Sequence, residues 1–407
     1  MIKVFSKIKA ILFPAVTIEK VKYKKQQKRY DLIMYDDIYP HPASGFRIEE
    51  FTYLLNNISN SKAILSGEAY KAFKLPAKQH EGHINNLIAS KLVTTKQIEQ
   101  TPGIININCK LFYCVFLNNI FKHLHWIEKY EIPFAFTLYP GGGFAVSEDE
   151  TENKLRKILS SPCFKKVIVT QRKTLNYLVE NSFCTKDKIL FVFGVVVPQV
   201  SLSGNTPQKK FYGTSKQSFD ICFCASKYTK FGEDKGYPLF VEFIKLMAIK
   251  YDFLKFHVVG GGFDKNVLDV STIEDRIEFY GQLDFDNLQL IFRNVDLIMS
   301  PNQPDKLNKG SFDGFPLGTV IEAAFNEVVV MLTDNFKENV YFEDGEELII
   351  IEPSLNDMVS KFEPLLTNID AFYEIGKRGK EKFRQIYSND YQMGPRTALL
   401  KSLIQAN

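Results

Sequence analysis

The chain has 407 residues, of which 45% are apolar and 24% are charged, and its formal net charge at pH 7 is +4. This balance is typical of a globular protein, and the length suits two domains of about 200 residues each. No uninterrupted apolar run reaches the roughly 18 residues of a membrane-spanning helix, so no transmembrane helix is expected.

Positive charge is concentrated in the first 29 residues. Nine basic residues and one acid give them a charge of +8, which leaves −4 for the remainder. Apolar residues such as Phe5, Ile8 and Leu12 alternate with the lysines, and such a segment can lie on an anionic bilayer. Its start is too short and too charged for a signal peptide. We therefore expect a cytoplasmic protein that touches the inner face of the cell membrane through residues 1–29, with a solvated terminus as the alternative. Nothing beyond charge suggests nucleic-acid binding.

The six cysteines are scattered among strand-like and loop segments. Cys222 and Cys224 have the wrong spacing for a zinc knuckle, and their alternation places both on one face of a strand. Buried thiols in a reducing cytoplasm are expected.

Residues 30–198 alternate β-branched apolar runs with helical patterns, which predicts an α/β domain with a parallel sheet. The expected strands are Asp31–Tyr35, Ala63–Leu65, Gly103–Asn108, Phe134–Leu138, Lys166–Val169 and Ile189–Phe193. The expected helices are Arg47–Ile58, Glu81–Lys91, Asn118–Lys129, Thr151–Leu159 and Arg172–Asn181.

Residues 199–217 are polar and rich in Ser, Gly, Pro and Thr, which indicates an interdomain linker. A second α/β series covers residues 218–385, and residues 386–407 are expected to form a helix that packs back on the first domain. The expected strands of this series are Phe219–Cys224, Lys255–Val259, Ile277–Tyr280, Leu297–Ser300, Val328–Leu332 and Leu348–Ile351. The expected helices are Tyr237–Ile249, Asn287–Arg293, Thr319–Phe325 and most of Ile369–Ala406. The predicted fold class is α/β, with two doubly wound Rossmann-like domains facing each other across a cleft.

The most informative stretch is 311–350. Gly314 and Gly318 bracket a proline in a loop that feeds a helix, and a loop of this kind presents free N–H groups and the positive end of the helix dipole to an anion. Asp313 precedes the turn and Glu322 lies in the helix. Two carboxylates beside an anion site suit a ligand that also has hydroxyl groups, as a sugar nucleotide does.

This stretch resembles the donor site of GT-B glycosyltransferases, especially the retaining family four, whose pattern is E-G-F-x-L-x-x-x-E-A. Two departures are present: Asp313 replaces the first Glu, and one extra residue separates the two acids. The resemblance implies that Glu322 binds the nucleotide ribose and that Asp313 contacts the donor sugar. The loop between them is expected to hold the donor; it consists of Gly314, Phe315, Pro316, Leu317, Gly318 and Thr319.

Lys235 follows the strand Phe219–Cys224 and begins a helix, where a lysine suits a diphosphate. In the resembled family this position reads E-K-G, and the lysine neutralises the leaving diphosphate; a surface lysine is the alternative. The arginine that usually closes the preceding strand is missing, and Lys227 or Lys230 is the candidate substitute. A strand ending in Gly260 and Gly261 resembles the family's I-V-G-x-G, where backbone approaches the ligand closely; a plain turn is the alternative.

In the first domain, the strand Phe134–Leu138 ends at Tyr139, where comparable family members have a histidine near the reacting sugar. The glycines after Tyr139 either shape the acceptor side or form a simple turn. Gly45 and Arg47 follow the first strand, where GT-B enzymes place a loop facing the diphosphate; helix capping is the alternative. Asp284 is expected to cap a helix rather than bind a metal. No cluster has metal-ligand spacing, so catalysis without a metal or cofactor is expected.

The resemblance implies a retaining glycosyltransferase that moves a sugar from a nucleotide diphosphate to a saccharide or lipid-linked saccharide acceptor. The composition is rich in Lys, Asn, Phe and Ile, which suits an AT-rich bacterial genome. By association, we expect a role in bacterial surface polysaccharide synthesis, of the capsule or O-antigen type. One alternative is a non-catalytic partner subunit, because Tyr139, Ser226 and the acid spacing depart from the family. Another is a GT-B nucleotide-sugar epimerase. A dinucleotide dehydrogenase is disfavoured because no G-x-G-x-x-G follows the first strand.

Overall fold

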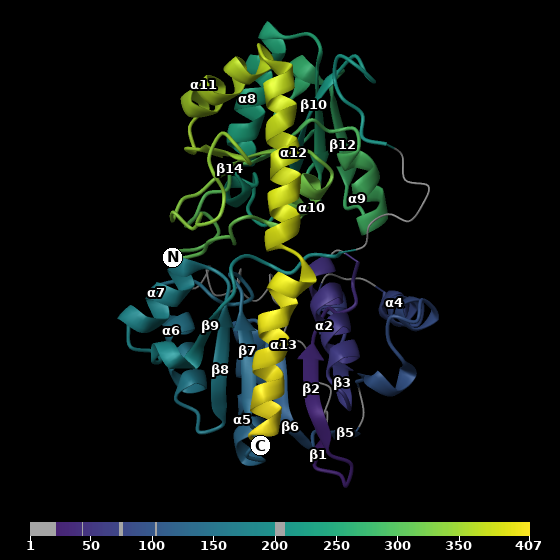
Figure 1. The fold of residues 1–407 in the computed structure, drawn as a ribbon, viewed down its shortest axis with the longest axis vertical. Coiled ribbons are helices and arrows are strands. Elements are labelled where there is room, and N and C mark those ends of the chain that lie inside the picture. The colour runs from purple at the N-terminus through teal and green to yellow at the C-terminus, as the bar shows by residue number, and fades with distance from the viewer. Residues whose placement is uncertain (1–21, 43, 73–75, 102–103, 200–207) are drawn as a thin grey trace, which may run out of the picture.

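The computed structural model describes residues 22–42, 44–72, 76–101, 104–199 and 208–407. The membrane expectation for residues 1–29 therefore falls largely outside the described residues. Two α/β domains are stacked along the long axis of the molecule (Figure 1), and each contains a parallel sheet. This confirms the predicted fold class. Among the described residues, no helix is both long and apolar enough to cross a membrane.

The N-terminal domain is built on a seven-stranded sheet with helices on both faces, and all of its strand pairs are parallel. Its strands, in spatial order, are β4 (Ile98–Gln100), β3 (Ser61–Leu65), β2 (Tyr30–Asp36), β6 (Cys109–Val115), β7 (Phe134–Leu138), β8 (Phe164–Val169) and β9 (Ile189–Phe191). Its helices are α2 (Gly45–Asn57), α3 (Glu68–Ala72), α4 (Ala77–Ala89), α5 (Leu117–Lys129), α6 (Asp149–Leu159) and α7 (Arg172–Glu180). A separate two-stranded pair joins β1 (Lys22–Lys24) to β5 (Ile104–Asn106).

Strand β6 was not expected from the sequence, although it lies between β2 and β7 near the middle of the sheet. The expected strand Gly103–Asn108 is present in part: Ile104–Asn106 is extended, but it pairs with β1 and does not join the large sheet. Both faces of a central parallel strand are buried, so its sequence reads as a continuous apolar run without alternation. The segment CKLFYCV fits that description, with six of its seven residues buried.

The C-terminal domain is built on a six-stranded sheet, again with parallel pairs throughout. Its strands, in spatial order, are β12 (Ile277–Gly281), β11 (Leu254–Val259), β10 (Phe219–Cys224), β13 (Leu297–Ser300), β14 (Val329–Thr333) and β15 (Ile349–Ile351). Its helices are α8 (Tyr237–Lys250), α9 (Phe285–Phe292), α10 (Gly318–Phe325), α11 (Leu355–Leu366) and α12 (Ile369–Ile386). Helix α11 was not expected; the other elements agree with the sequence within a few residues at their ends. Cys222 and Cys224 belong to one hydrophobic cluster on the same face of β10, as predicted.

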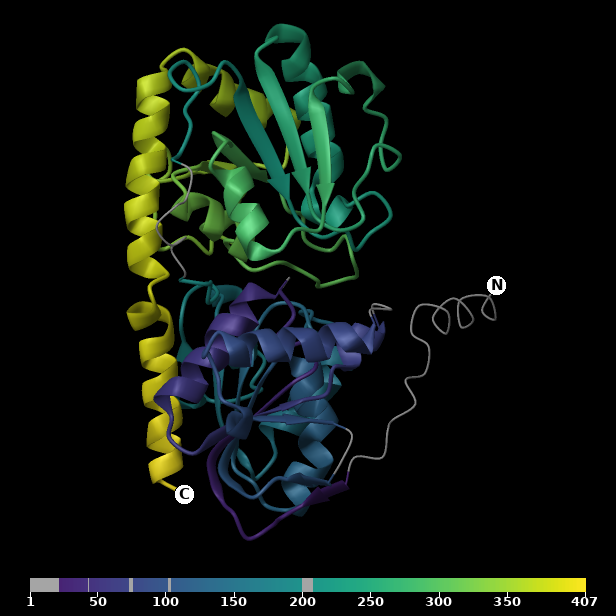
Figure 2. The same cartoon turned by 90° about the vertical axis from the view of Figure 1, so that its right-hand side faces the viewer.

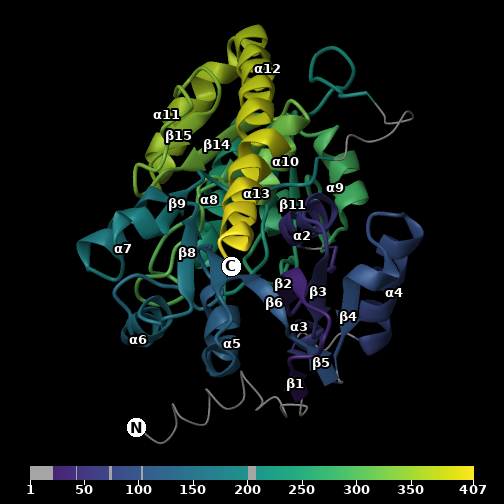
Figure 3. The same cartoon turned by 60° about the horizontal axis from the view of Figure 1, so that its bottom comes forward.

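The C-terminal helices α12 and α13 (Asn389–Gln405) run down one edge of the molecule and connect the two domains (Figure 2). Helix α12 packs against β14, whereas α13 lies against α2 and β6 of the N-terminal domain (Figures 1 and 3). Met393, Leu400 and Ile404 of α13 are buried in the hydrophobic cluster of that domain. The described chain leaves the N-terminal domain at residue 199 and resumes on the C-terminal domain at residue 208, and it returns to the N-terminal domain between α12 and α13.

The second part of the polar segment 199–217 is packed on the C-terminal domain rather than extended between domains. The ammonium of Lys209 donates to the carbonyl of Phe292 at 3.0 Å, and the backbone N–H of Tyr212 donates to the hydroxyl of Tyr373 at 2.8 Å. Burial lowers the pKa of Lys209 to about 7, although the nearby Asp296 carboxylate opposes this effect.

We predict that Leu400→Ala lowers the free energy of unfolding by about 2–5 kcal/mol, because the fully buried side chain leaves a cavity between α13 and the N-terminal domain. The neighbouring exposed residue Lys401 gives the control: Lys401→Ala should change the free energy of unfolding by less than about 0.5 kcal/mol. Urea denaturation measures both. Equal effects of the two substitutions would contradict the packing of α13.

Candidate active site

The carboxyl-terminal ends of the C-terminal strands open on a pocket between the domains. Gly45 and Pro42 line it from the N-terminal domain, and Ala225, Gly260 and Glu322 are among the residues that line it from the C-terminal domain. In open α/β sheets, ligands bind at this edge. The pocket therefore has the position expected for a nucleotide.

This pocket is lined by two acids, Asp284, which caps α9, and Glu322. Glu322 lies on α10, and its carboxylate forms no hydrogen bond or ion pair with any residue that the structure describes. Burial raises the pKa of Glu322 to about 8. Gly45 is opposite, since a Cβ atom built there would lie 3.8 Å from Oε1 of Glu322. A half-buried carboxylate without a protein partner is suited to accept hydrogen bonds from the hydroxyl groups of a ligand.

The start of α10 lies beside this carboxylate. Leu317 occupies the position before the helix and provides no side-chain cap, so no side chain in the described part of the chain satisfies the first N–H groups. Thr319 also lines the pocket, and its hydroxyl donates to the carbonyl of Cys224 at 3.2 Å, which holds α10 against the end of β10.

Gly260 brings the ends of β10 and β11 close together. Its φ is +133°, and a Cβ atom there would lie 1.6 Å from the carbonyl oxygen of Ala225, so no other residue fits. The next carbonyl, of Gly261, accepts a hydrogen bond from the N–H of Lys227 at 3.0 Å. Of these residues, Ala225 and Gly260 line the pocket, whereas Gly261 and Lys227 do not.

A buried ion pair forms the second part of the site. Lys235, in the short turn Glu233–Lys235, is 6% exposed, and its ammonium donates to both oxygens of Asp313 at 2.6 and 2.7 Å. Burial by itself would lower the pKa of Lys235, but Asp313 and the more weakly coupled Asp234 hold this pKa above its usual value. Asn302 donates to the same carboxylate of Asp313 at 3.1 Å. The two residues predicted for diphosphate and sugar thus lie in direct contact.

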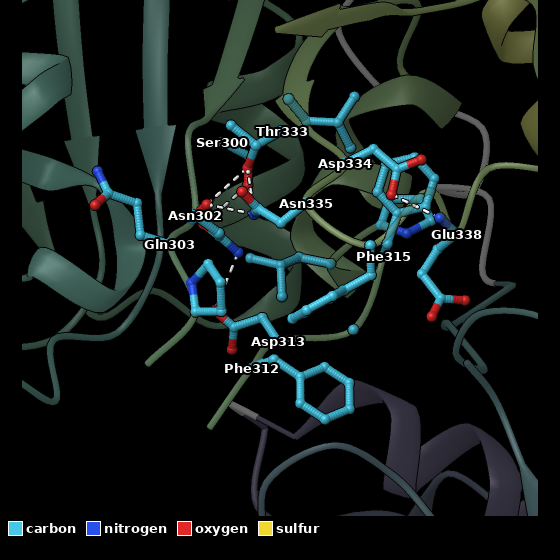
Figure 4. Close-up of a pocket in the computed structure, with 16 residues that line it drawn as sticks. Ser300, Asn302, Gln303, Phe312, Asp313, Phe315, Thr333, Asp334, Asn335 and Glu338 are labelled. Carbon is cyan, nitrogen blue, oxygen red and sulfur yellow. Dashed lines mark hydrogen bonds between the residues drawn. The ribbon is translucent and has the colours of Figure 1, made fainter. Parts of the chain in front are cut away.

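Asp313 also faces a second, polar pocket beside the loop that precedes α10 (Figure 4). Gly314, Phe315, Pro316 and Leu317 of the predicted donor loop line this pocket together with a set of amide, hydroxyl and carboxylate side chains: Ser300, Asn302, Gln303, Thr333, Asp334 and Asn335. Such side chains can bind the hydroxyl groups of a sugar, which need both donors and acceptors.

Two of the candidates in the N-terminal domain have structural roles instead. Tyr139 is 4% exposed, and its hydroxyl donates to the buried carboxylate of Glu50 on α2 at 2.8 Å, so it is a core residue and does not face a reacting sugar. Burial, reinforced by Glu50, raises the pKa of Tyr139. Arg47 donates to Asp36 at 2.9 Å and to the Ser44 hydroxyl at 2.7 Å, and it lines neither of the two pockets.

The remaining predictions have mixed outcomes. Lys227 donates its ammonium to the carbonyl of Lys230 at 3.1 Å. Neither Lys227 nor Lys235 is among the residues that line the two pockets, but Lys235 is paired with Asp313, which lines the second pocket. Asp284 caps α9 by accepting from the N–H of Asn287 at 2.9 Å, as predicted. Among the described residues, no group of three His, Cys, Asp or Glu side chains is arranged to hold a metal ion.

Residues of the site that the sequence did not indicate are Asn302, which contacts Asp313, and the interdomain residues Gln171 and Glu338. Gln171 follows the end of β8, a position where a polar residue is a usable signal for a site at the sheet edge. Glu338 follows no strand directly and carries no comparable signal.

The C-terminal domain is similar to a known protein family. Residues 219–368 match the family model described as glycosyl transferases group 1. The chain is a GT-B protein with a glycosyl transferases group 1 domain. Domain and fold together classify it as a glycosyltransferase. No curated protein sequence matches it.

Solved structures similar to this GT-B protein share its fold at low sequence identity. HepE from Anabaena, in complex with UDP and glucose, has a TM-score of 0.63 and 11% identity, covering 91% of this chain and 98% of that one. Sucrose-phosphate synthase from Thermosynechococcus elongatus has a TM-score of 0.61 and 12% identity, covering 94% and 100%. TarM from S. aureus has a TM-score of 0.53 and 17% identity, covering 72% and 55%.

The raised pKa of Glu322 predicts a pH-dependent stability. The folded protein keeps a proton on Glu322 that the unfolded chain loses, so ionisation of this group lowers the unfolding free energy as the pH rises from about 4.5 to about 8. Glu322→Gln removes this contribution. Its stability relative to wild type should therefore increase over that range, by a few kcal/mol at most, since one pKa unit corresponds to about 1.4 kcal/mol.

Urea denaturation at several pH values measures this difference. The exposed Glu381→Gln is the control and should follow wild type at every pH. A difference between Glu322→Gln and wild type that stays constant with pH would show that Glu322 ionises normally.

Proposed function

We propose that this glycosyltransferase moves a sugar, with retention of anomeric configuration, from a nucleoside diphosphate to a saccharide or lipid-linked saccharide acceptor. The observation that supports this most directly is the pairing of two features on one edge of the C-terminal sheet. Glu322 is an acceptor without a protein partner, and Lys235 is a buried cation held on Asp313. These three side chains match the three parts of a nucleotide sugar: Glu322 the ribose, Lys235 the diphosphate and Asp313 the sugar.

In the proposed reaction, the bond between the anomeric carbon and the diphosphate oxygen breaks, and a bond from that carbon to an acceptor hydroxyl oxygen forms. The hydroxyl proton leaves with the diphosphate or to solvent. An ammonium has three N–H donors, and Asp313 accepts from Lys235 through its two oxygens, so the ammonium can also donate to a phosphate oxygen. Lys235 then stabilises the charge that develops on the leaving group.

Glu322 would orient the ribose and Asp313 the donor sugar in this reaction. The interdomain position of the Glu322 pocket would exclude water, which otherwise hydrolyses the donor. Retention is supported by the resemblance to family four and by TarM, whose structure contains alpha-GlcNAc-glycerol and UDP. HepE binds UDP and glucose, which makes UDP-glucose the first donor to test.

We predict that Lys235→Ala lowers kcat for donor turnover by about 10²–10³-fold, because it removes the group that stabilises the leaving diphosphate. Glu322→Ala should weaken donor binding, since the ribose loses its acceptor. The exposed Lys255→Ala is the control and should match wild type. Turnover of a panel of UDP-, GDP-, ADP- and dTDP-hexoses, with and without EDTA, measures these effects, and activity should survive EDTA.

Full turnover in both Lys235→Ala and Glu322→Ala would contradict the site. Turnover by wild type that releases an epimerised nucleotide sugar without acceptor would instead identify an epimerase. An inert wild type that binds another transferase would identify a partner subunit.

We also propose that residues 1–29 bring the enzyme to an anionic membrane, in the setting of bacterial surface polysaccharide synthesis. Their charge of +8 and interspersed apolar residues support this. The full chain should co-sediment with vesicles containing phosphatidylglycerol but not with phosphatidylcholine vesicles. Replacing Lys3, Lys7 and Lys9 by Gln should weaken binding at moderate salt, since each nearby charge contributes about 1 kcal/mol. Unchanged sedimentation of this variant would refute the proposal.

A further inference from the structure

The loop that carries Asp313 connects β13 to α10, and the N-terminal domain holds it on both sides of that residue. On the upstream side, Phe312 belongs to the hydrophobic cluster of the N-terminal domain, and its ring centroid lies 5.9 Å from that of Phe144. The carbonyl of Gly310 accepts from the N–H of Val146 at 2.9 Å. Gly310 is required there, because its φ is +77° and a Cβ atom would lie 1.8 Å from the Val146 carbonyl oxygen.

On the downstream side, one side chain of the N-terminal domain binds both backbone groups of Phe315. The Gln171 carboxamide oxygen accepts from the N–H of Phe315 at 3.0 Å, and its nitrogen donates to the carbonyl of Phe315 at 3.3 Å. Gln171 is 1% exposed, so these bonds are shielded from water. A Cβ atom at Gly314 would lie 3.4 Å from the same carboxamide nitrogen, which shows how closely Gln171 approaches the loop.

Gln171 is available for this contact because the C-terminal domain caps its helix. It occupies the N-cap position of α7, where a side chain usually accepts from the first N–H groups of its own helix, but it makes no such bond. Glu338 of the C-terminal domain does so instead, accepting from the N–H groups of Arg172 and Lys173. Glu338 is 2% exposed, and its charge also complements the helix dipole. In Figure 4 the side chains of Glu338 and Phe312 point away from Ser300 and Thr333, toward the N-terminal domain.

The two contacts are therefore reciprocal. Glu338 of the C-terminal domain caps α7, and Gln171 at the start of α7 binds the loop of the C-terminal domain. Asp313 lies between the two anchor points, Phe312 and Phe315, and its carboxylate pairs with Lys235. A shift of the N-terminal domain relative to the C-terminal one would move both anchors and the Asp313 carboxylate with them.

We propose that Gln171 and Glu338 are positioning residues that set the Asp313 carboxylate against the donor sugar only when the two domains are packed together. This inference rests on the proposed function. The hydrogen bonds of Gln171 do not reach Glu322, because no described hydrogen bond or ion pair joins the Glu322 carboxylate to the loop. Breaking the contact should therefore impair the chemical step more than the binding of the nucleotide.

The test is a double-mutant cycle on the nucleotide sugar of the panel that wild type turns over. Gln171→Leu removes both bonds to Phe315 at similar volume, and Asp313→Asn removes the charge that the contact positions. Gln171→Leu alone should lower kcat by up to about 10²-fold, as expected for a misplaced reacting group. It should raise the Kd of the corresponding nucleoside diphosphate by a smaller factor than it lowers kcat, because Glu322 still holds the ribose although Lys235 is displaced together with Asp313. In the Asp313→Asn background, Gln171→Leu should have little further effect on kcat.

Two further variants complete the design. Glu338→Gln should reproduce the effect of Gln171→Leu, because it leaves the start of α7 without its carboxylate cap, and it serves if Gln171→Leu does not fold. Asn176→Leu also replaces a carboxamide side chain by leucine, at an exposed position of α7, and should match wild type. Thermal unfolding of each variant verifies the fold.

Additive losses in the Asp313→Asn background, or a loss of nucleoside diphosphate affinity equal to the loss in kcat, would overturn the positioning role while leaving the proposed function intact. A wild type that turns over no nucleotide sugar would overturn the proposed function, and this inference with it.

Discussion

The buried ion pair between Lys235 and Asp313 is the contact on which the rest of the site depends. Removing one partner from such a pair leaves an uncompensated charge in the interior, which costs several kcal/mol. The pair joins the turn before α8 to the loop before α10, so it connects two of the segments that follow the strands of the C-terminal sheet. Because the N-terminal domain contacts the same loop through Gln171, the geometry of this pair is a property of both domains.

The C-terminal domain could be predicted from the sequence in considerable detail. Apolar runs bounded by turn residues located strands such as Phe219–Cys224 and Leu297–Ser300 at the ends that the structure has. The glycines and acids of the loop before α10 also identified the edge of the sheet where the site lies. These signals are local, since strand length, helix capping and glycine conformation are decided within a few residues. The contact between Lys235 and Asp313 was not predicted, because the pairing of two loops depends on how the strands are ordered in the sheet.

The N-terminal domain was predicted less well, and its errors have physical causes. The central strand β6 lacks alternation, because neighbouring elements cover both of its faces. Tyr139 directly follows a strand at the expected position. The sequence does not show that Glu50, a buried acid on α2, accepts a hydrogen bond from its hydroxyl. Likewise, Arg47 is neutralised by Asp36. A motif gives the position of a residue along the chain, whereas the direction of its side chain depends on partners far away in the sequence.

The central claim is that the C-terminal domain holds an activated sugar by its nucleotide, with Glu322 on the ribose and Lys235 on the diphosphate. A crystal structure with the nucleoside diphosphate that protects the chain most against thermal unfolding tests it directly. The claim predicts ribose hydroxyl groups within about 3.2 Å of the Glu322 carboxylate and a phosphate oxygen equally close to the Lys235 ammonium. A nucleotide bound elsewhere, with Glu322 still lacking a partner, would contradict it.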